Sequence, residues 1–209
     1  MNQSLALAIP RQSGEYRRLA DSPFSVRPTR QRLLIVMDLN GTLLERTNFK
    51  SNFVPRQNLS SFLAYLLVHH NIMIWSSSKP ENVKNMVNQL FPGTQNQLVG
   101  VWSRDHLRLT PAQYNSKVQV YKQLSWIWTD PSLSKRHPEG EIWNQTNTVL
   151  LDDTALKAIT EPHNLCQIPE FKRANVDAEG DVLGQVLAYL VYLSDYDNAS
   201  AVIKVQPFQ

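Results

Sequence analysis

The chain has 209 residues, of which 42% are hydrophobic and 19% are charged, and its formal net charge is +3. This length suffices for one α/β domain with a sizeable core. Much of the excess positive charge precedes residue 33, so the rest of the chain shows no basic region typical of nucleic-acid binding. The single cysteine, Cys166, excludes an intrachain disulfide and a multi-cysteine zinc site, and no apolar run approaches the ~20 residues of a membrane span.

Residues 1–31 are rich in arginine, contain Pro10, Pro23 and Pro28, and show no sustained hydrophobic period. We therefore expect a flexible basic leader ahead of one folded domain over residues 32–209. The leader lacks the long apolar segment of a secretory signal. An intracellular location, nuclear or cytoplasmic, is expected, and the arginine- and serine-rich leader leaves a mitochondrial location open.

The first predicted elements alternate between strands and helices. Residues 32–39 (RLLIVMDL) form a continuous apolar run, which is typical of a strand buried on both faces of a parallel sheet. Residues 58–70 place apolar side chains at helical spacing, and residues 71–75 (NIMIW) predict a second buried strand. A further helix is expected from near Pro80 until just before Pro92.

The later elements continue this alternation. They are a strand, the end of a helix, a strand that ends in acids, a short apolar segment and an amphipathic helix, at residues 97–104, 117–128, 147–153, 165–169 and 181–194. The pattern predicts a doubly wound, mostly parallel open α/β sheet. Ligands bind such sheets at the carboxyl ends of the strands, where this sequence has Asp38, Ser76 and Asp152.

Asp38 ends the first predicted strand, and Gly41 and Thr42 follow it closely. A carboxylate in this position can attack an electrophile as a nucleophile. Gly41 permits a tight turn, and the backbone N–H groups of that turn can hold an anion. An aspartate that only caps the loop is the alternative, and this motif alone does not decide between the two.

Three further features suit phosphoryl transfer, although each has a structural alternative. The Ser76 hydroxyl can bind a phosphoryl oxygen or cap the next helix. Lys117 or Lys122 can offset the charge of the transferred group, although most lysines only face solvent. Asp152 and Asp153 follow a buried strand, where they can hold a hard cation such as Mg2+ or cap a helix.

A nucleophilic aspartate, a hydroxyl, a lysine and an acid pair follow one another in the order used by the haloacid-dehalogenase superfamily of aspartyl phosphohydrolases, which this chain resembles. Within it, the chain resembles the NLI-interacting-factor-like family, which includes phosphatases of the RNA polymerase II C-terminal domain. The resemblance covers about residues 32–194 and rests on IMIWSSSKPENVKNMVNQL, VWSRDHL, VYKQLSWIW, NTVLLDDT and EPHNLCQIPEF. It implies a small β insert between residues 92 and 121 and no large cap domain.

The resemblance also implies roles for individual residues. Asp38 would be the nucleophile that forms an aspartyl-phosphate, and Lys122 rather than Lys117 would be the motif lysine. The phosphoryl group would be bound by Gly41, Thr42, Ser76, Ser77 and Lys122. Mg2+ would be held by Asp38, the backbone carbonyl of Asn40, Asp152 and Asp153. The substrate would be phosphoserine or phosphothreonine in a protein or peptide, with no direct nucleic-acid partner, and the oligomeric state stays open.

Asn40 departs from the family, which has an aspartate here as general acid and base. An amide cannot carry a proton, so a loss of ~10²–10⁴-fold in rate is expected if nothing replaces it, most severely for alkyl phosphates. Three alternatives remain open. The chain can be a slow phosphatase, a pseudophosphatase that serves as a phosphoprotein-binding or assembly scaffold, or a protein with an engineered substitution that traps substrate.

Two other sets of side chains have alternative interpretations. Trp126, Trp128 and Trp143 can form an aromatic peptide groove or pack in the core. His69, His70 and His163 offer no obvious complete metal site, so solvated or capping roles are expected.

Overall fold

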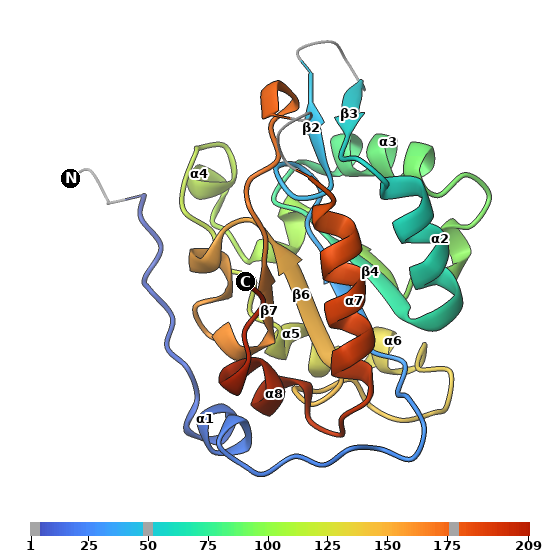
Figure 1. Cartoon of the computed structure of the whole chain (residues 1–209). Helices are drawn as coiled ribbons and strands as arrows, with labels where there is room; N and C mark the ends of the chain where they lie inside the picture. Colours follow the sequence, from blue (N-terminus) through green and yellow to red (C-terminus); the bar gives the residue numbers. More distant parts are fainter. Residues whose placement is uncertain (1–4, 48–51, 176–179) are drawn as a thin grey trace.

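The computed structural model describes residues 5–47, 52–175 and 180–209, and in these ranges a five-stranded parallel sheet has the order β5-β4-β1-β6-β7 (Figure 1). Its strands are β1 (Leu34–Met37), β4 (Asn71–Trp75), β5 (Gly100–Trp102), β6 (Thr148–Asp152) and β7 (Leu165–Gln167). The central strand β1 pairs with β4 and β6, and every residue in it is buried. The predicted parallel sheet is confirmed.

Helices cover both faces of the sheet, because alternate side chains of each strand point to opposite faces. Ile35 and Met37 lie in one core with α2 (Leu59–His69), α3 (Pro80–Leu90), α7 (Val182–Ser194) and α8 (Ala199–Val205). Leu34 and Val36 lie in a second core with residues of α5 (Ser125–Trp128) and α6 (Pro131–Ser134). Figure 1 shows α2 and α7 side by side in front of the sheet. This layering is the doubly wound α/β architecture.

The long helices begin and end close to the predicted residues. Pro80 occupies the first turn of α3, where its missing N–H costs no hydrogen bond. Asp181 caps α7 by accepting a hydrogen bond from the Gly184 backbone N–H at 2.9 Å. Asn58 precedes α2 and donates its side-chain N–H to Asp181 at 3.0 Å, which joins the starts of α2 and α7. In the described ranges, no helix has both the length and the apolar character to cross a membrane.

The small antiparallel sheet lies elsewhere than the sequence predicts. It consists of β2 (Leu44–Arg46) and β3 (Phe53–Pro55), just after the Asp38 turn. Residues 92–121 were expected to form a β insert, but they contain β5 of the main sheet and short helical turns. In this segment the Arg104 guanidinium, and not a neighbouring strand, donates to the carbonyls of Tyr114 and Ser116, each at 2.7 Å, so their backbone groups are satisfied without a sheet.

Short helical segments complete the description. They are η1 (Gln95–Gln97), η2 (Arg104–Leu107), α4 (Pro111–Tyr114), η3 (Ala155–Ala158), η4 (Pro162–Asn164) and η5 (Arg173–Asn175).

The predicted flexible leader lies partly against the domain. It contains α1 (Gly14–Ala20), in which Tyr16 is 4% exposed and its hydroxyl oxygen accepts a hydrogen bond from His163 N–H at 2.8 Å. Gln145 donates to the Tyr16 carbonyl at 2.9 Å, and Arg27 N–H donates to the Asp195 carbonyl at 2.7 Å. In Figure 1 this segment runs beneath the domain toward β1. These contacts are made by single buried residues. The leader therefore has no periodic hydrophobic pattern from which they could have been predicted.

Candidate active site

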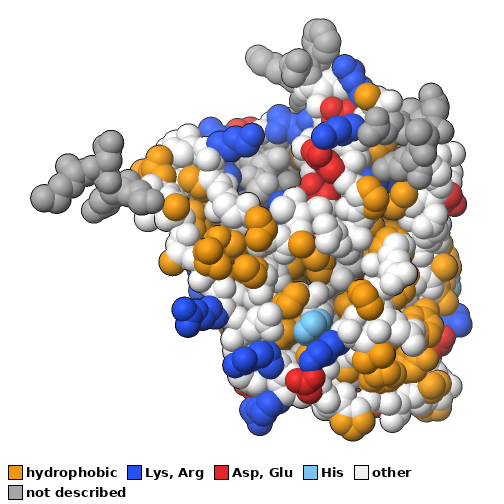
Figure 2. Space-filling view, turned by 60° about the vertical axis from the view of Figure 1, so that its left-hand side comes forward, with side chains coloured by type: hydrophobic (Ala, Val, Ile, Leu, Met, Phe, Trp, Pro, Cys, Tyr) orange, Lys and Arg blue, Asp and Glu red, His pale blue; other side chains and the backbone are white. Residues whose placement is uncertain are grey.

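Polar side chains from three neighbouring strands meet at the carboxyl edge of the sheet. Asp38 follows β1, Ser76 follows β4 and Asp152 ends β6, and β1 pairs with both of the other strands. Asp38, Asp152 and Asp153 each bring one carboxylate oxygen within 4.8 Å of the others. In Figure 2, acidic and basic side chains lie close together at the upper end of the molecule, whereas Asp38 and Asp152 themselves are buried. The acids cluster here because neighbouring parallel strands share one carboxyl edge, as the sequence predicts.

Lys122 lies between two of these acids and is entirely buried. Its Nζ donates to Asp152 Oδ2 at 2.7 Å and lies 3.3 Å from Asp38 Oδ1. Lys122, and not Lys117, therefore occupies the position beside the proposed nucleophile. Burying this ammonium group is tolerable only because carboxylates compensate its charge.

A second lysine, Lys157, enters the same cluster and is absent from the predicted site. Its Nζ lies 2.6 Å from Asp38 Oδ2, 2.8 Å from Asp152 Oδ1 and 3.3 Å from Asp153 Oδ1. Burial alone would lower the pKa of Lys157, but the charges of Asp38 and Asp152 and hydrogen bonds to both raise that pKa above its usual value. A lysine four residues after Asp153, in a helical turn, is the signal that could have found it.

Backbone contacts hold the two lysines together. The Lys122 N–H donates to the Lys157 carbonyl at 2.7 Å. Glu161 accepts hydrogen bonds from the Leu124 N–H, at 3.1 Å, and from the Thr160 hydroxyl. Burial raises the pKa of Glu161 although these hydrogen bonds lower it. These hydrogen bonds connect the segment around Lys122 to the segment around Lys157, and both segments lie beside the acids.

The turn after Asp38 packs directly on the acid pair. Gly41 has φ +84°, and a Cβ added there would lie 3.2 Å from Asp153 Oδ2. The Thr42 hydroxyl donates to Asp153 Oδ1 at 3.3 Å and accepts from the Asp153 N–H at 3.2 Å. The N–H groups of Gly41 and Thr42 donate to the carbonyls of Leu44 and Leu39. These two N–H groups close the turn in this structure, and the role of Gly41 and Thr42 in binding an anion stays a prediction.

The two serines after β4 differ in their surroundings. Ser76 is buried, and its hydroxyl oxygen accepts a hydrogen bond from Ser78 N–H at 3.3 Å, which leaves its hydrogen available for donation. Ser77 is half-buried, and its carbonyl accepts from Arg104 Nη1 at 3.4 Å. Arg104 therefore ties the Ser76–Ser77 turn to the chain that follows β5.

Asn40 is exposed at the rim of this site. Its Oδ1 accepts a hydrogen bond from the Arg46 N–H at 2.9 Å, which connects the turn to β2. A carboxylate could accept the same hydrogen bond, so this contact does not require an amide.

The donor set fits a hard divalent cation. Asp38, Asp152 and Asp153 provide the oxygen ligands that Mg2+ prefers. Asp38 Oδ1 is buried and makes no hydrogen bond among the described residues, although it lies near Lys122. The opposite oxygen of Asp38 faces Lys157, so a cation position already exists between the three carboxylates.

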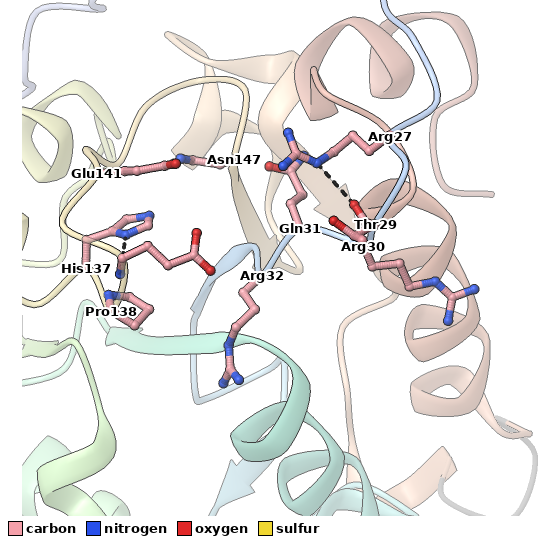
Figure 3. A pocket seen from close by; sticks show the side chains of 10 residues that line it. Arg27, Thr29, Arg30, Gln31, Arg32, His137, Pro138, Glu141 and Asn147 are labelled. Atoms are coloured by element: carbon pink, nitrogen blue, oxygen red, sulfur yellow. Dashed lines mark hydrogen bonds between the residues drawn. The ribbon is translucent and has the colours of Figure 1, made fainter.

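A separate pocket of about 120 Å³ lies at the other end of the sheet (Figure 3). Its lining includes Arg32, just before β1, and Asn147, just before β6. Figure 3 shows the guanidinium groups of Arg30 and Arg32 pointing in different directions, and Arg30 pairs with Asp195 at 2.8 Å. The basic side chains of this pocket therefore do not converge on one centre.

The tryptophans and histidines for which the sequence left alternatives lie in the core or at its margin. Trp143 is buried and donates to the Leu133 carbonyl at 3.2 Å, which confirms core packing for this residue. Trp126 and Trp128 are half-buried at the margin of the same core, and each lines a surface pocket. His70 is buried rather than solvated, and His163 stacks on the ring of Tyr16. Among the described residues, the metal-type cluster contains aspartates alone.

A parallel sheet whose central strand is followed directly by an aspartate, with a buried lysine and an acid pair beside it, defines a haloacid-dehalogenase-like α/β protein. The sequence comparison places the chain more narrowly. The chain belongs to the NLI interacting factor-like phosphatase family, whose model matches residues 33–200.

Individual proteins are similar to this chain. An uncharacterised FCP1 homology domain-containing protein of Schizosaccharomyces pombe is 32% identical over 198 residues, covering 87% of this chain and 79% of the relative. A ubiquitin-like domain-containing CTD phosphatase of Arabidopsis thaliana is 25% identical over 179 residues, covering 83% and 50%. The solved structure of Fcp1, an essential RNA polymerase II CTD phosphatase, matches with a TM-score of 0.46 and 14% identity, covering 83% and 50%. The chain spans about half the length of these last two proteins.

Proposed function

We propose that the chain is a magnesium-dependent phosphoprotein phosphatase that acts on phosphoserine or phosphothreonine through an aspartyl-phosphate on Asp38. The observation that carries this proposal is the different surroundings of the two Asp38 oxygens. Oδ2 faces the Lys157 ammonium group together with oxygens of Asp152 and Asp153, whereas Oδ1 makes no hydrogen bond among the described residues and lies 3.3 Å from Lys122. Oδ1 is therefore the oxygen available to attack phosphorus.

The reaction has two displacements. Asp38 Oδ1 attacks phosphorus, the bond from phosphorus to the leaving oxygen breaks, and that oxygen departs with the electron pair and takes up a proton from solvent. A water oxygen then attacks phosphorus and gives up a proton to solvent, the bond to Asp38 breaks, and phosphate leaves. Lys122 lies where it offsets negative charge on the transferred group, and the Ser76 hydroxyl can donate to a phosphoryl oxygen. A bound Mg2+ supplies further charge neutralisation.

Asn40 slows the proposed reaction in a substrate-dependent way. Its amide cannot protonate a serine alkoxide or deprotonate the attacking water. An aryl oxygen leaves without much protonation, so an aryl phosphate should retain more of its rate in the first displacement. The relatives named as CTD phosphatases support a phosphoprotein substrate. They accord with action in the nucleus or cytoplasm and lend no support to the mitochondrial alternative.

A second candidate is a pseudophosphatase that binds phosphoproteins or assembles a complex. Two observations favour it. Asn40 lacks the acid–base function, and the Lys157 ammonium group fills the cation position between the three carboxylates. Such a protein would bind phosphate without completing turnover.

The test is an assay of the parent, Asp38→Ala and Asn40→Asp with Mg2+, on an aryl phosphate and a phosphoserine peptide. We expect slow aryl phosphate turnover that Asp38→Ala abolishes. Asn40→Asp should raise peptide turnover by ~10²–10⁴-fold, the usual worth of general acid–base help. The control is Asn88→Asp, which makes the same change at an exposed amide near the end of α3.

Each outcome separates the candidates. Turnover that depends on Asp38 supports the phosphatase. Phosphopeptide binding without turnover in the parent supports the pseudophosphatase. Neither turnover nor phosphopeptide binding in any variant would show that this edge of the sheet is not a phosphoryl site.

A further inference from the structure

Lys157 and a divalent cation require the same three oxygen atoms. Lys157 Nζ contacts Asp38 Oδ2, Asp152 Oδ1 and Asp153 Oδ1 at 2.6, 2.8 and 3.3 Å. Mg2+ binds oxygen at about 2.0–2.1 Å, so a cation between these oxygens would overlap the ammonium group. The two cannot occupy the position together.

We propose that Lys157 is a tethered counter-ion that competes with the divalent cation, so that the cation binds only when Lys157 swings out of the cluster. This inference rests on the proposed magnesium site. It adds that metal affinity is set by a side chain of this chain and not only by the three carboxylates.

The surroundings of the two lysines indicate which one moves. Lys122 is 0% exposed and donates to Asp152, so it is the more enclosed of the two lysines. Lys157 has a side chain that is 12% exposed and projects from the single turn η3 at the surface of the cluster. Its flexible four-carbon stem can carry the ammonium group into water by rotation alone.

The charge of the cluster gives Lys157 a role when no cation is bound. Three carboxylates and two ammonium groups leave an excess of one negative charge, whereas loss of Lys157 would leave an excess of two. Lys157 therefore prevents the buried carboxylates from repelling one another. The same attraction must be broken when a cation enters, which lowers the affinity for the cation.

The first test measures Mn2+ binding by electron paramagnetic resonance in the parent and in Lys157→Met. Removing the ammonium group should tighten the dissociation constant by about ten- to hundredfold, because charge-assisted hydrogen bonds no longer have to break. Without metal, Lys157→Met should melt at a lower temperature than the parent, and Mg2+ should raise its melting temperature more than it raises the parent's. Lys84→Met, at an exposed position on α3, should leave both quantities unchanged.

The second test uses the unaltered chain and so does not depend on whether the variant folds. Acetylation of Lys157 by an amine reagent, read by peptide mass spectrometry, should become several-fold faster when Mn2+ is added. Lys122 is the internal control and should stay unmodified in the folded protein. An unchanged or slower rate at Lys157 would overturn the proposal, as would equal Mn2+ affinity of the parent and Lys157→Met.

Failure of this inference is distinguishable from failure of the proposed function. Magnesium-dependent turnover that requires Asp38, together with equal Mn2+ affinities, would leave the phosphatase standing and remove Lys157 as the competitor. Tighter Mn2+ binding by Lys157→Met without turnover in either protein would support the competition and point to the pseudophosphatase.

Discussion

Gly41 shows how one residue connects the turn after Asp38 to the acid pair. Its φ of +84° is one that glycine adopts without steric cost, and the space where a Cβ would lie is limited by Asp153 Oδ2 at 3.2 Å. The absence of a side chain therefore serves two purposes. It permits the turn, and it keeps the Asp153 carboxylate in place beside Asp38 and Asp152.

We expect Gly41→Ala to lower the free energy of unfolding by ~1–3 kcal/mol and to weaken Mn2+ binding by displacing Asp153. Gly140 is the matched control, because it has φ +71° but nothing within 4 Å of the added Cβ. Gly140→Ala should therefore cost stability through its backbone alone and leave Mn2+ binding intact. Urea unfolding and Mn2+ titration of both variants check this. Equal losses of metal affinity in the two would contradict the role of crowding at Asp153.

At the scale of elements, the end of α2 contains a buried group that responds to pH. His70 follows the last residue of α2, is 4% exposed, and has no hydrogen-bond partner for its ring nitrogens among the described residues. Burial lowers the pKa of His70 from 6.5 to about 4, and the neighbouring His69 and Arg32 add to the effect. The folded protein therefore holds this imidazole neutral.

This lowered pKa predicts loss of stability on acidification. Between pH 6.5 and about 4 the unfolded chain binds a proton at His70 that the folded chain does not, so stability falls as the pH falls through this window. The full effect is up to about 3 kcal/mol at the low end. His70→Leu should flatten the dependence of unfolding free energy on pH, whereas His69→Leu, which removes only a smaller contribution to the lowered pKa of His70, should keep most of it. Urea unfolding from pH 7 to 4 measures this, and parallel curves for the parent and His70→Leu would refute it.

At the scale of the whole molecule, residues that precede the sheet contribute to its stability. Tyr16 of α1 is buried against η4 and α8, at the end of the sheet opposite to the acids. Its hydroxyl oxygen satisfies the His163 N–H and its carbonyl accepts from Gln145. The leader is therefore part of the packed structure on this side.

We expect Tyr16→Ala to lower the free energy of unfolding by ~3–5 kcal/mol, the usual cost of removing a large buried aromatic side chain. Tyr16→Phe removes only the acceptor for the His163 N–H and should cost ~1–3 kcal/mol. Turnover should persist in both under conditions where they are folded, because the acids lie at the other end of the strands. Changes within ~0.5 kcal/mol for both variants would instead show a leader that is free of the domain.

Local patterns in the sequence already determined the main architecture. Continuous apolar runs identified β1, β4 and β6 because a strand buried on both faces needs apolar side chains at every position. Since parallel strands share a carboxyl edge, the residues at their ends also indicated where Asp38, Ser76 and Asp152 would meet. The resemblance, and not spacing, selected Lys122 over Lys117, and the roles of all these residues remain predictions.

Only the tertiary structure decided which remote groups complete the site and the fold. Lys157 reaches the acids because η3 packs beside β6 and a lysine stem is long and flexible, so its neighbours in sequence do not determine what its ammonium group contacts. Arg104 holds the chain after β5, where a β insert was expected, by hydrogen bonds to backbone carbonyls, and such contacts leave no side-chain pattern in the sequence. Tyr16 packs against the domain through one ring and two hydrogen bonds, and a single residue of this kind produces no periodic hydrophobic pattern in the sequence.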